Sequence, residues 1–241
     1  MDGRRPEPAE GATAPARSVR SFVVRAGRTS QAQRAALQTL LPHYGLADGD
    51  GPIDFTALFG RRAPRVVEIG FGNGATLVEM ARMAPEQDFL GIEVYPPGIG
   101  HCLQAAHAEG LTNLRVAQAD AVALLRNRVP DGALDRVQVY FPDPWPKKRH
   151  HKRRLIQPEF LSLLAAKVRP GGHLHLATDW APYAEAMLAH LEAAQNWRNT
   201  APAPECFVRA AGLRPTTKFE TRGKRLGHGV WDLLFVREGS G

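Results

Sequence analysis

The residues best suited to chemistry lie in one short stretch, 141–154, which reads FPDPWPKKRHHKRR. One acid, Asp143, and one aromatic, Trp145, stand directly before six Lys or Arg residues and two His residues. Prolines at positions 142, 144 and 146 fix φ and bias each preceding residue toward extended geometry, so we expect Asp143 and Trp145 to be held stiffly. Because like charges repel unless a polyanion neutralises them, we interpret the cationic run as a contact for RNA or DNA rather than as a solvated loop.

A second candidate is the glycine turn GFGNG at 70–74, which follows the apolar run VVEI. Glycine permits positive φ and lets a ligand approach the backbone closely. The spacing of Gly70, Gly72 and Gly74 differs from the G-x-G-x-x-G of dinucleotide-binding proteins, and no Lys follows, which disfavours NAD and a Walker-type phosphate loop. Taken alone, the turn is equally well explained as an ordinary connection between a strand and a helix.

Four acids recur at the ends of successive apolar runs: Glu68, Glu93, Asp120 and Asp143. If these runs are parallel strands, all four acids reach one edge of the sheet, where open α/β sheets bind ligands. An acid after the second strand suits the two hydroxyls of a ribose, and an acid after the third can accept from an adenine amino group. The recurrence therefore predicts a nucleoside site.

The elements that must position these residues alternate along the chain, which predicts an α/β fold with a mainly parallel sheet covered by helices. The expected strands cover residues 65–69, 88–92, 114–117, 134–141, 173–177 and 231–236. The expected helices between them cover residues 75–83, 99–109, 121–126, 158–168 and 181–194. Earlier in the chain a helix is expected over 31–41, closed by Pro42, and Gly171 with Gly172 predicts a tight turn into the fifth strand.

Composition bounds the class of protein. With 241 residues, 44% of them hydrophobic, the chain can bury one large α/β domain. We divide it into a disordered tail (1–19), a basic arm with a helical segment (20–62) and a catalytic domain (63–241). The net charge of +7 suits a nucleic-acid partner. No apolar run approaches the roughly 18 residues of a membrane span, so we expect a cytoplasmic protein without a membrane partner.

Cysteine and histidine usage gives no sign of a metal site. Cys102 and Cys206 lack a C-x-x-C partner, and no His cluster has metal-ligand spacing, so we expect neither a metal nor a disulfide. The sequence leaves open whether the chain is a monomer or a homodimer.

Several segments together resemble the bacterial tRNA (guanine-N7) methyltransferases. They are EIGFGNG at 68–74, GIEV at 91–94, the whole 141–154 stretch, ATDW at 177–180, TKFE at 217–220 and GHGVWDL at 227–233. The resemblance extends from about Arg20 to Arg237. It implies a Rossmann-like class I methyltransferase fold with a seven-stranded, mainly parallel sheet. It also implies S-adenosylmethionine as methyl donor and N7 of guanine 46 in the tRNA variable loop as acceptor.

The resemblance also implies roles for individual residues. The cofactor would be held by Glu68, Glu93, Asp120 and Asp143 around the loop of Gly70, Gly72 and Gly74, and Asp143 would mark the active site. The tRNA would be contacted by Lys147, Asp179, Thr217, Lys218, Phe219 and Glu220, and by an RNA-contact loop of Arg149, His150, His151, Lys152, Arg153 and Arg154. Asp179 could also cap the helix expected from residue 181.

Guanine N7 carries a lone pair and no proton, so its methylation needs alignment and charge stabilisation rather than a general base. Asp143 could accept from the N1–H and N2–H edge of guanine, whereas Trp145 could stack a base or only fill the loop.

Three alternatives compete with this interpretation. Amino-group methyltransferases acting on RNA or protein usually carry Asn/Asp-Pro-Pro-Tyr after the fourth strand, and Trp145 in place of the second Pro disfavours that class. A non-catalytic RNA-binding module is disfavoured by the intact acids, and a dehydrogenase by the glycine spacing.

Overall fold

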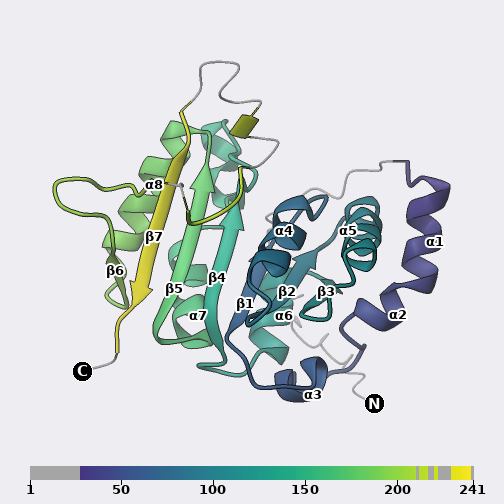
Figure 1. The fold of residues 1–241 in the computed structure, drawn as a ribbon. Coiled ribbons are helices and arrows are strands. Elements are labelled where there is room, and N and C mark those ends of the chain that lie inside the picture. Colours follow the sequence, from purple (N-terminus) through teal and green to yellow (C-terminus); the bar gives the residue numbers. More distant parts are fainter. Residues whose placement is uncertain (1–27, 210–211, 217–219, 222–228, 240–241) are drawn as a thin grey trace, which may run out of the picture.

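The computed structural model describes residues 28–209, 212–216, 220–221 and 229–239, and these form a single seven-stranded sheet flanked by helices (Figure 1). Its strands are β1 Arg65–Ile69, β2 Asp88–Glu93, β3 Leu114–Gln118, β4 Leu134–Tyr140, β5 Val168–Thr178, β6 Trp197–Asn199 and β7 Trp231–Arg237. They lie in the order β3-β2-β1-β4-β5-β7-β6. β1 to β5 run parallel and β7 is antiparallel to its neighbours β5 and β6. The predicted mainly parallel, seven-stranded α/β sheet is confirmed.

The helices cover both faces of the sheet (Figure 1). They are α1 Gln31–Thr39, α2 Leu41–Tyr44, α3 Phe55–Phe59, α4 Ala75–Met83, α5 Pro96–Ala108, α6 Ala121–Arg128, α7 Pro158–Lys167 and α8 Ala181–Glu192, with the 3-10 helix η1 Lys148–Arg153. Among the helices of the described residues, none combines the length and apolarity that crossing a membrane requires.

Alternating residues along the strands contribute their side chains to two hydrophobic cores, one on each face of the sheet. On β1, Val67 and Ile69 pack with side chains of α6, α7 and α8, whereas Val66 packs on the opposite face with Leu77 of α4 and Leu103 of α5. Strands buried on both faces read as continuous apolar runs, which is why β1, β2 and β4 were recognisable in the sequence. Full burial of one such side chain contributes about 1.5–3 kcal/mol, so the two cores fix where the strand ends lie.

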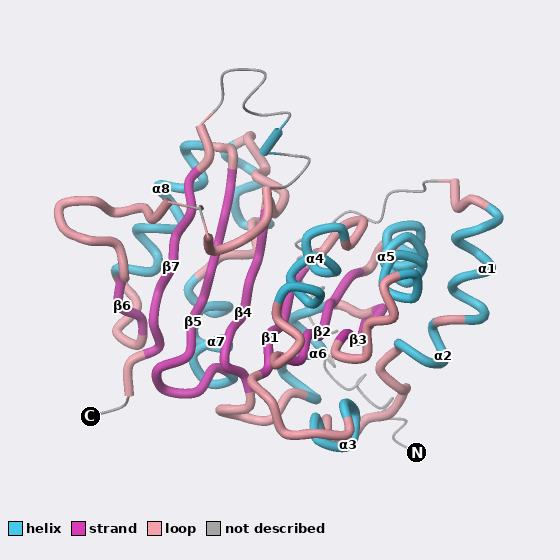
Figure 2. The backbone as a smooth tube through the Cα atoms, in the orientation of Figure 1, coloured by secondary structure: helices cyan, strands magenta, loops and turns pink. Residues whose placement is uncertain are grey.

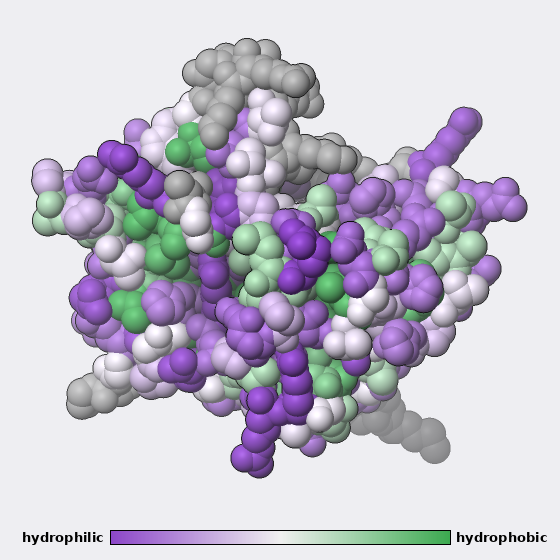
Figure 3. Space-filling model, viewed as in Figure 1, coloured by the Kyte–Doolittle hydropathy of each residue, from purple (hydrophilic) through white to green (hydrophobic). Residues whose placement is uncertain are grey.

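One half of the sheet is covered differently. In front of β5 and β7, among the described residues, no helix packs; described residues of the connection between β6 and β7 pass there instead (Figure 2). Val208 pairs with Asp232 of β7, and Arg136 of β4 donates to the Leu213 carbonyl. The surface on this side mixes apolar and hydrophilic side chains (Figure 3). This face is therefore closed by an irregular segment over polar strand residues.

Two predictions about element boundaries were wrong. Pro42 does not close the first helix: α1 ends at Thr39, and Pro42 lies in the first turn of α2, where a missing N–H costs nothing. Gly171 and Gly172 form no turn ahead of the fifth strand, because β5 begins at Val168 and passes through them as a bulge. Gly172 allows this, since a Cβ there would lie 2.8 Å from the Asp135 carbonyl oxygen.

Four further elements were not predicted as elements of their own: the edge strand β6, the short helices α2 and η1, and α3. Asp54 caps α3 through a bond from the Ala57 amide, and α3 ends at the left-handed Gly60.

Candidate active site

A cavity of about 640 Å3 lies at the carboxyl ends of β1, β2 and β4, beside the point where the strand order reverses. Open α/β sheets bind ligands at this switch point, and small-ligand sites typically measure about 300–1,000 Å3. Its apolar wall includes Ile69, Ile92 and Val139, from the ends of these three strands. The cavity therefore lies at the edge of the sheet where the sequence places the candidate site.

The glycine loop contributes backbone to this cavity. Gly70 and Gly72 take φ of 72° and 60°, and a Cβ at either would meet no atom within 4 Å, so both face open space. Gly74 also has positive φ, but it does not line the cavity, and a Cβ there would lie 2.4 Å from the Cys102 Cβ. On α5, a Cβ at Gly98 would lie 2.1 Å from the Gly72 carbonyl oxygen. Gly70 and Gly72 thus admit a ligand, whereas Gly74 and Gly98 bring α4, α5 and the loop together.

Glu93 ties the loop to the end of β2. Its Oε2 accepts from the Gly72 amide at 2.9 Å, and its Oε1 accepts from the Val94 amide at 2.6 Å and the Tyr95 amide at 3.0 Å. Three backbone donors fix the carboxylate at the cavity wall. A carboxylate has about four lone-pair sites, so Oε2 of Glu93 keeps one with which it could accept from a ribose hydroxyl.

Asp120 and Glu68 reach the same edge of the sheet but do not line the cavity. Asp120 caps α6, with its Oδ1 accepting from the Val122 and Ala123 amides at 2.9 and 3.1 Å. Its neighbours Ala119 and Ala121 form the wall instead.

Glu68 is buried, and its Oε2 accepts from the Gln138 amide nitrogen at 2.7 Å. Burial raises the pKa of Glu68 to about 7, against the opposing effects of the Gln138 hydrogen bond and the Arg136 charge.

Asp143 is exposed at the opposite side of the cavity, in a turn with unusual backbone. Phe141 and Trp145, which flank it, take φ of 52° and 43°. The prediction that prolines would hold Trp145 extended was wrong: the backbone enters the left-handed region, where a non-glycine residue costs about 1–3 kcal/mol. Phe141 is nevertheless pinned, since its amide donates to the Ala177 carbonyl at 2.8 Å. Strain of this kind persists where surrounding contacts fix the geometry, which is common at active sites.

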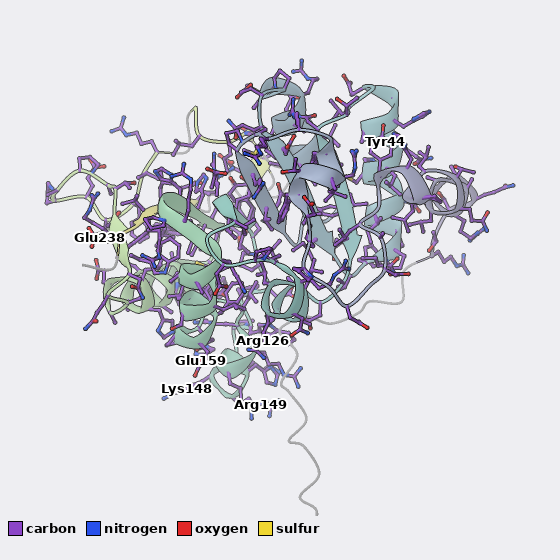
Figure 4. All side chains as sticks on the ribbon, turned by 90° about the horizontal axis from the view of Figure 1, so that it is seen from below. Tyr44, Arg126, Lys148, Arg149, Glu159 and Glu238 are labelled. Carbon is purple, nitrogen blue, oxygen red and sulfur yellow. The ribbon has the colours of Figure 1, made fainter. Side chains whose placement is uncertain are left out.

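The cationic run forms η1 and packs on Trp145. The Arg153 guanidinium lies 5.1 Å from the Trp145 ring centroid, and the His150 ring meets the indole edge-on at 5.8 Å. These contacts favour the interpretation that Trp145 packs the loop. Lys147, Lys148, Arg149, Lys152 and Arg153 are exposed, while His150 and His151 are half-buried. In Figure 4, Lys148 and Arg149 project from the body of the molecule on the side of Glu159.

Arg154 differs from the other cations of the run. It is buried, its Nε donates to the Pro144 carbonyl at 2.9 Å, and its guanidinium lies 4.7 Å from the Tyr183 ring centroid. It anchors the run to the Asp143 turn and to α8.

The remaining residues predicted to contact tRNA differ in how they are placed. Asp179 is half-buried after β5, and it is Trp180 that stands at the N-cap of α8, without a side-chain cap bond, so the capping alternative for Asp179 was wrong. Thr217, Lys218 and Phe219 lie outside the described residues. Glu220 is buried and accepts from Arg214 at 2.7 Å.

Sequence reasoning missed Arg28, Gln33, Tyr95 and His101, which also line the cavity. The only signal was the basic character of the arm that contains Arg28. No group of three or more His, Cys, Asp or Glu within the described ranges could hold a metal ion.

Comparisons with known proteins agree with this geometry. Residues 62–233 match a family model described as "Putative methyltransferase". The tRNA (guanine-N(7)-)-methyltransferase of Halorhodospira halophila is 57% identical over 220 residues, which cover 91% of this chain and 95% of that protein. Those of Saccharophagus degradans and Stutzerimonas stutzeri are each 52% identical, over 92% and 98% of this chain and 96% and 99% of theirs.

Among solved structures, the 16S rRNA methyltransferase KamB has a TM-score of 0.57 at 20% identity, covering 78% of this chain and 95% of its own. A 16S rRNA methyltransferase with the cosubstrate SAM, from Catenulisporales acidiphilia, has a TM-score of 0.54 at 19% identity, covering 80% and 94%. These likenesses show that the fold is that of a class I methyltransferase.

Proposed function

The chain belongs to the tRNA (guanine-N(7)-)-methyltransferase family, and we propose that it methylates N7 of guanine 46 in the variable loop of tRNA with S-adenosylmethionine as donor. The observation that carries this proposal is one cavity with Glu93 and the glycine loop on one side and Asp143 on the other. The exposed cations of η1 follow directly after the turn that carries Asp143.

The residues of the cavity fit the donor. Glu93 would hold a ribose hydroxyl, Gly70 and Gly72 would let the backbone approach, and Ile69 and Ile92 supply the apolar wall. Asp120 and Glu68 would act from behind the wall, by fixing α6 and the end of β1. S-adenosylmethionine supplies a methyl group on a sulfonium, and its transfer to N7 moves the positive charge onto the base without releasing a proton.

Asp143 would serve the acceptor. Its exposed carboxylate would accept from the N1–H and N2–H of guanine, which adenine cannot offer in that pattern, and would stabilise the charge that develops on the base. A hydrogen bond to a charged group contributes about 1.5–3 kcal/mol, so loss of the charge should slow methylation by roughly tenfold to hundredfold.

The tRNA would be bound by the exposed members of the run, Lys147, Lys148, Arg149, Lys152 and Arg153, because phosphate contacts supply most of the affinity and position the substrate. We assign the chemistry to residues 63–241, with α1 and α2 as an N-terminal addition that packs on α5 and β3. A cytoplasmic location, where tRNA is processed, is part of the same proposal.

The test is to identify the methylated atom. After incubation of tRNA with labelled donor, borohydride opens the ring of 7-methylguanosine and aniline then cleaves the chain there. We expect cleavage at one variable-loop guanine, none in a transcript with adenine at that position, and little with Asp143→Asn although that variant still binds tRNA. Asp50→Asn, which removes an exposed carboxylate that does not line the cavity, is the matched control. Labelled tRNA that resists cleavage would mean methylation at another atom and would transfer the proposal to an amino-group methyltransferase.

A further inference from the structure

A chain of buried side-chain contacts crosses the sheet, on the face that α4 covers over β1 and β4 and that no described helix covers over β5 and β7. It joins residues of β1, β4, β5, β7 and the segment between β6 and β7, namely Glu68, Gln138, Tyr140, His175, Asp232, Arg214 and Glu220. Of these residues, the sequence analysis gave a role only to Glu68, as a cofactor contact, and to Glu220, as a tRNA contact. The chain passes beside the Asp143 side of the cavity, because Tyr140 also lines the cavity and Arg214 lies over the ring of Phe141, another lining residue.

Arg214 is the centre of this arrangement. Its side chain has no exposed area, and it binds Asp232 in a bidentate pair, with Nε to Oδ1 at 2.7 Å and Nη2 to Oδ2 at 2.8 Å. Its Nη1 donates to Glu220 at 2.7 Å. The guanidinium carbon Cζ also lies 5.5 Å from the ring centroids of both Tyr140 and Phe141. A planar, delocalised cation can satisfy two carboxylates and two rings at once, which a point charge cannot.

The donors around His175 determine which of its two ring nitrogens carries the proton. Arg136 carries only donors and points one at His175 Nδ1, at 2.8 Å, so that nitrogen accepts. His175 Nε2 therefore bears the proton and donates to Asp232 at 2.9 Å. Burial lowers the pKa of His175, which keeps the ring neutral. Asp232 thus receives from a neutral ring and from Arg214, so Arg214 is held from two sides by anions and is not free to rotate.

Arg214 contacts the acceptor side of the cavity through the ring of Phe141. Phe141 has φ of 52° and leads through Pro142 directly to Asp143. A strained residue keeps its conformation only where its surroundings fix it. The guanidinium above the Phe141 ring, together with the Phe141 amide bond to Ala177, supplies such a support.

We propose that Arg214 is a positioning residue for the methyl acceptor: it holds Phe141 and Tyr140 and thereby the turn that carries Asp143, and Glu220 acts on the reaction through Arg214 rather than by touching tRNA. The inference rests on the function proposed above. It assigns to Glu220 a role different from the tRNA contact that the sequence implied. A buried carboxylate already bound to a guanidinium is poorly placed to meet a polyanion, whereas it is well placed to orient the cation.

Arg214→Lys tests the positioning role, because it keeps the charge and loses the bidentate fork and the planar contact with the rings. We expect the single-turnover rate at saturating donor and tRNA to fall by roughly 10- to 100-fold, the loss that follows from misplacing a reacting group by about 1 Å. The dissociation constants for S-adenosylmethionine and tRNA should stay at their wild-type values. If Arg214 only stabilised the fold, Arg214→Lys would lower the melting temperature, but it would not slow the single-turnover step while leaving both dissociation constants unchanged. Arg198→Lys is the matched control. Arg198 lies on β6 and forms an exposed ion pair with Glu238, so this variant should leave the rate unchanged.

A double-mutant cycle tests the role of Glu220. If Glu220 acts through Arg214, Glu220→Gln slows the single-turnover step in the wild-type background and has little further effect in Arg214→Lys. If Glu220 contacts tRNA, Glu220→Gln weakens tRNA binding by the same factor in both backgrounds, and that result overturns the proposal. A wild-type rate in folded Arg214→Lys overturns it as well.

Asp232→Asn gives an independent route to the same step should Arg214→Lys melt below the assay temperature. It keeps the shape at that position and removes the charge that orients Arg214, so the same loss of rate with unchanged affinities is expected, and a normal rate contradicts the proposal. Failure of the proposed function looks different, since the wild-type protein itself would then give no aniline-sensitive site in tRNA.

Discussion

Glu68→Gln should change how the stability of the fold depends on pH. Glu68 is buried with 3% of its surface exposed, and its carboxyl group faces Gln138, Arg136 and, at longer range, Glu93. Burial raises its pKa from an ordinary 4.5 to about 7. An acid whose pKa is higher in the folded than in the unfolded chain stabilises the fold fully below the unfolded value, and that contribution is lost as the pH rises through the folded value.

The size of the effect follows from the two pKa values. The interval from 4.5 to about 7, at about 1.36 kcal/mol per pH unit, corresponds to on the order of 3 kcal/mol, most of it lost between about pH 5 and pH 8. Glutamine has nearly the same shape, its carbonyl oxygen can still accept from Gln138, and it does not ionise. Glu68→Gln should therefore be more stable relative to wild type at pH 8 than at pH 5, by about 2–3 kcal/mol.

Urea unfolding at both pH values, followed by circular dichroism, measures this difference. Glu159→Gln, an exposed carboxylate on α7, is the control and should show no such change between the two pH values. An equal difference between Glu68→Gln and wild type at both pH values would refute the reasoning, because Glu68 would then titrate alike in the folded and unfolded chains.

Three further outcomes are expected at the cavity and the cationic run. Glu93→Gln should raise the S-adenosylmethionine dissociation constant roughly tenfold to hundredfold, since bonds to a charged acceptor contribute about 1.5–3 kcal/mol; calorimetry that finds no change would remove Glu93 from the donor site. Replacing Lys148, Arg149 and Lys152 with Ala should flatten the salt dependence of tRNA binding by up to about one unit of slope per lost phosphate contact, with the donor affinity unchanged. Arg154→Ala should instead lower the melting temperature, because Arg154 is buried on Pro144 and Tyr183; a loss of salt dependence alone would contradict that.

The sequence predicted the sheet and the place of the site because both depend on patterns that are local. Apolar runs of five to seven residues mark strands buried on both faces. An acid at the end of each run must then lie at one edge of a parallel sheet. The pattern could not predict in which direction each of these acidic side chains points. Glu93 lies at the cavity wall, whereas Asp120 turns to cap a helix and Glu68 points into the sheet.

The cationic run shows, over a shorter stretch of sequence, the same limit on what residue types can predict. Arg149 and Arg154 are the same residue type within six positions, yet one is exposed and the other is buried. The difference arises because the end of η1 returns Arg154 to the Pro144 carbonyl and the ring of Tyr183, contacts 10 and 29 positions away along the chain. Charge patterns give the net sign of a segment, but only the path of the backbone decides which cation reaches a phosphate.

The two sides of the cavity are held by different kinds of contact, and this has a consequence for how the protein meets its substrates. On the side of Glu93, backbone amides of residues 72, 94 and 95 fix the carboxylate, so this side is formed by neighbouring segments of β2 and the glycine loop alone. On the side of Asp143, the turn is supported by Arg214 and the anions around it, which come from β7 and from a segment more than 70 residues further along the chain. The donor side should therefore tolerate changes in the C-terminal segment, whereas the acceptor side should not. In the proposed function, the donor can therefore bind before tRNA, and methyl transfer depends on Arg214 and Glu220.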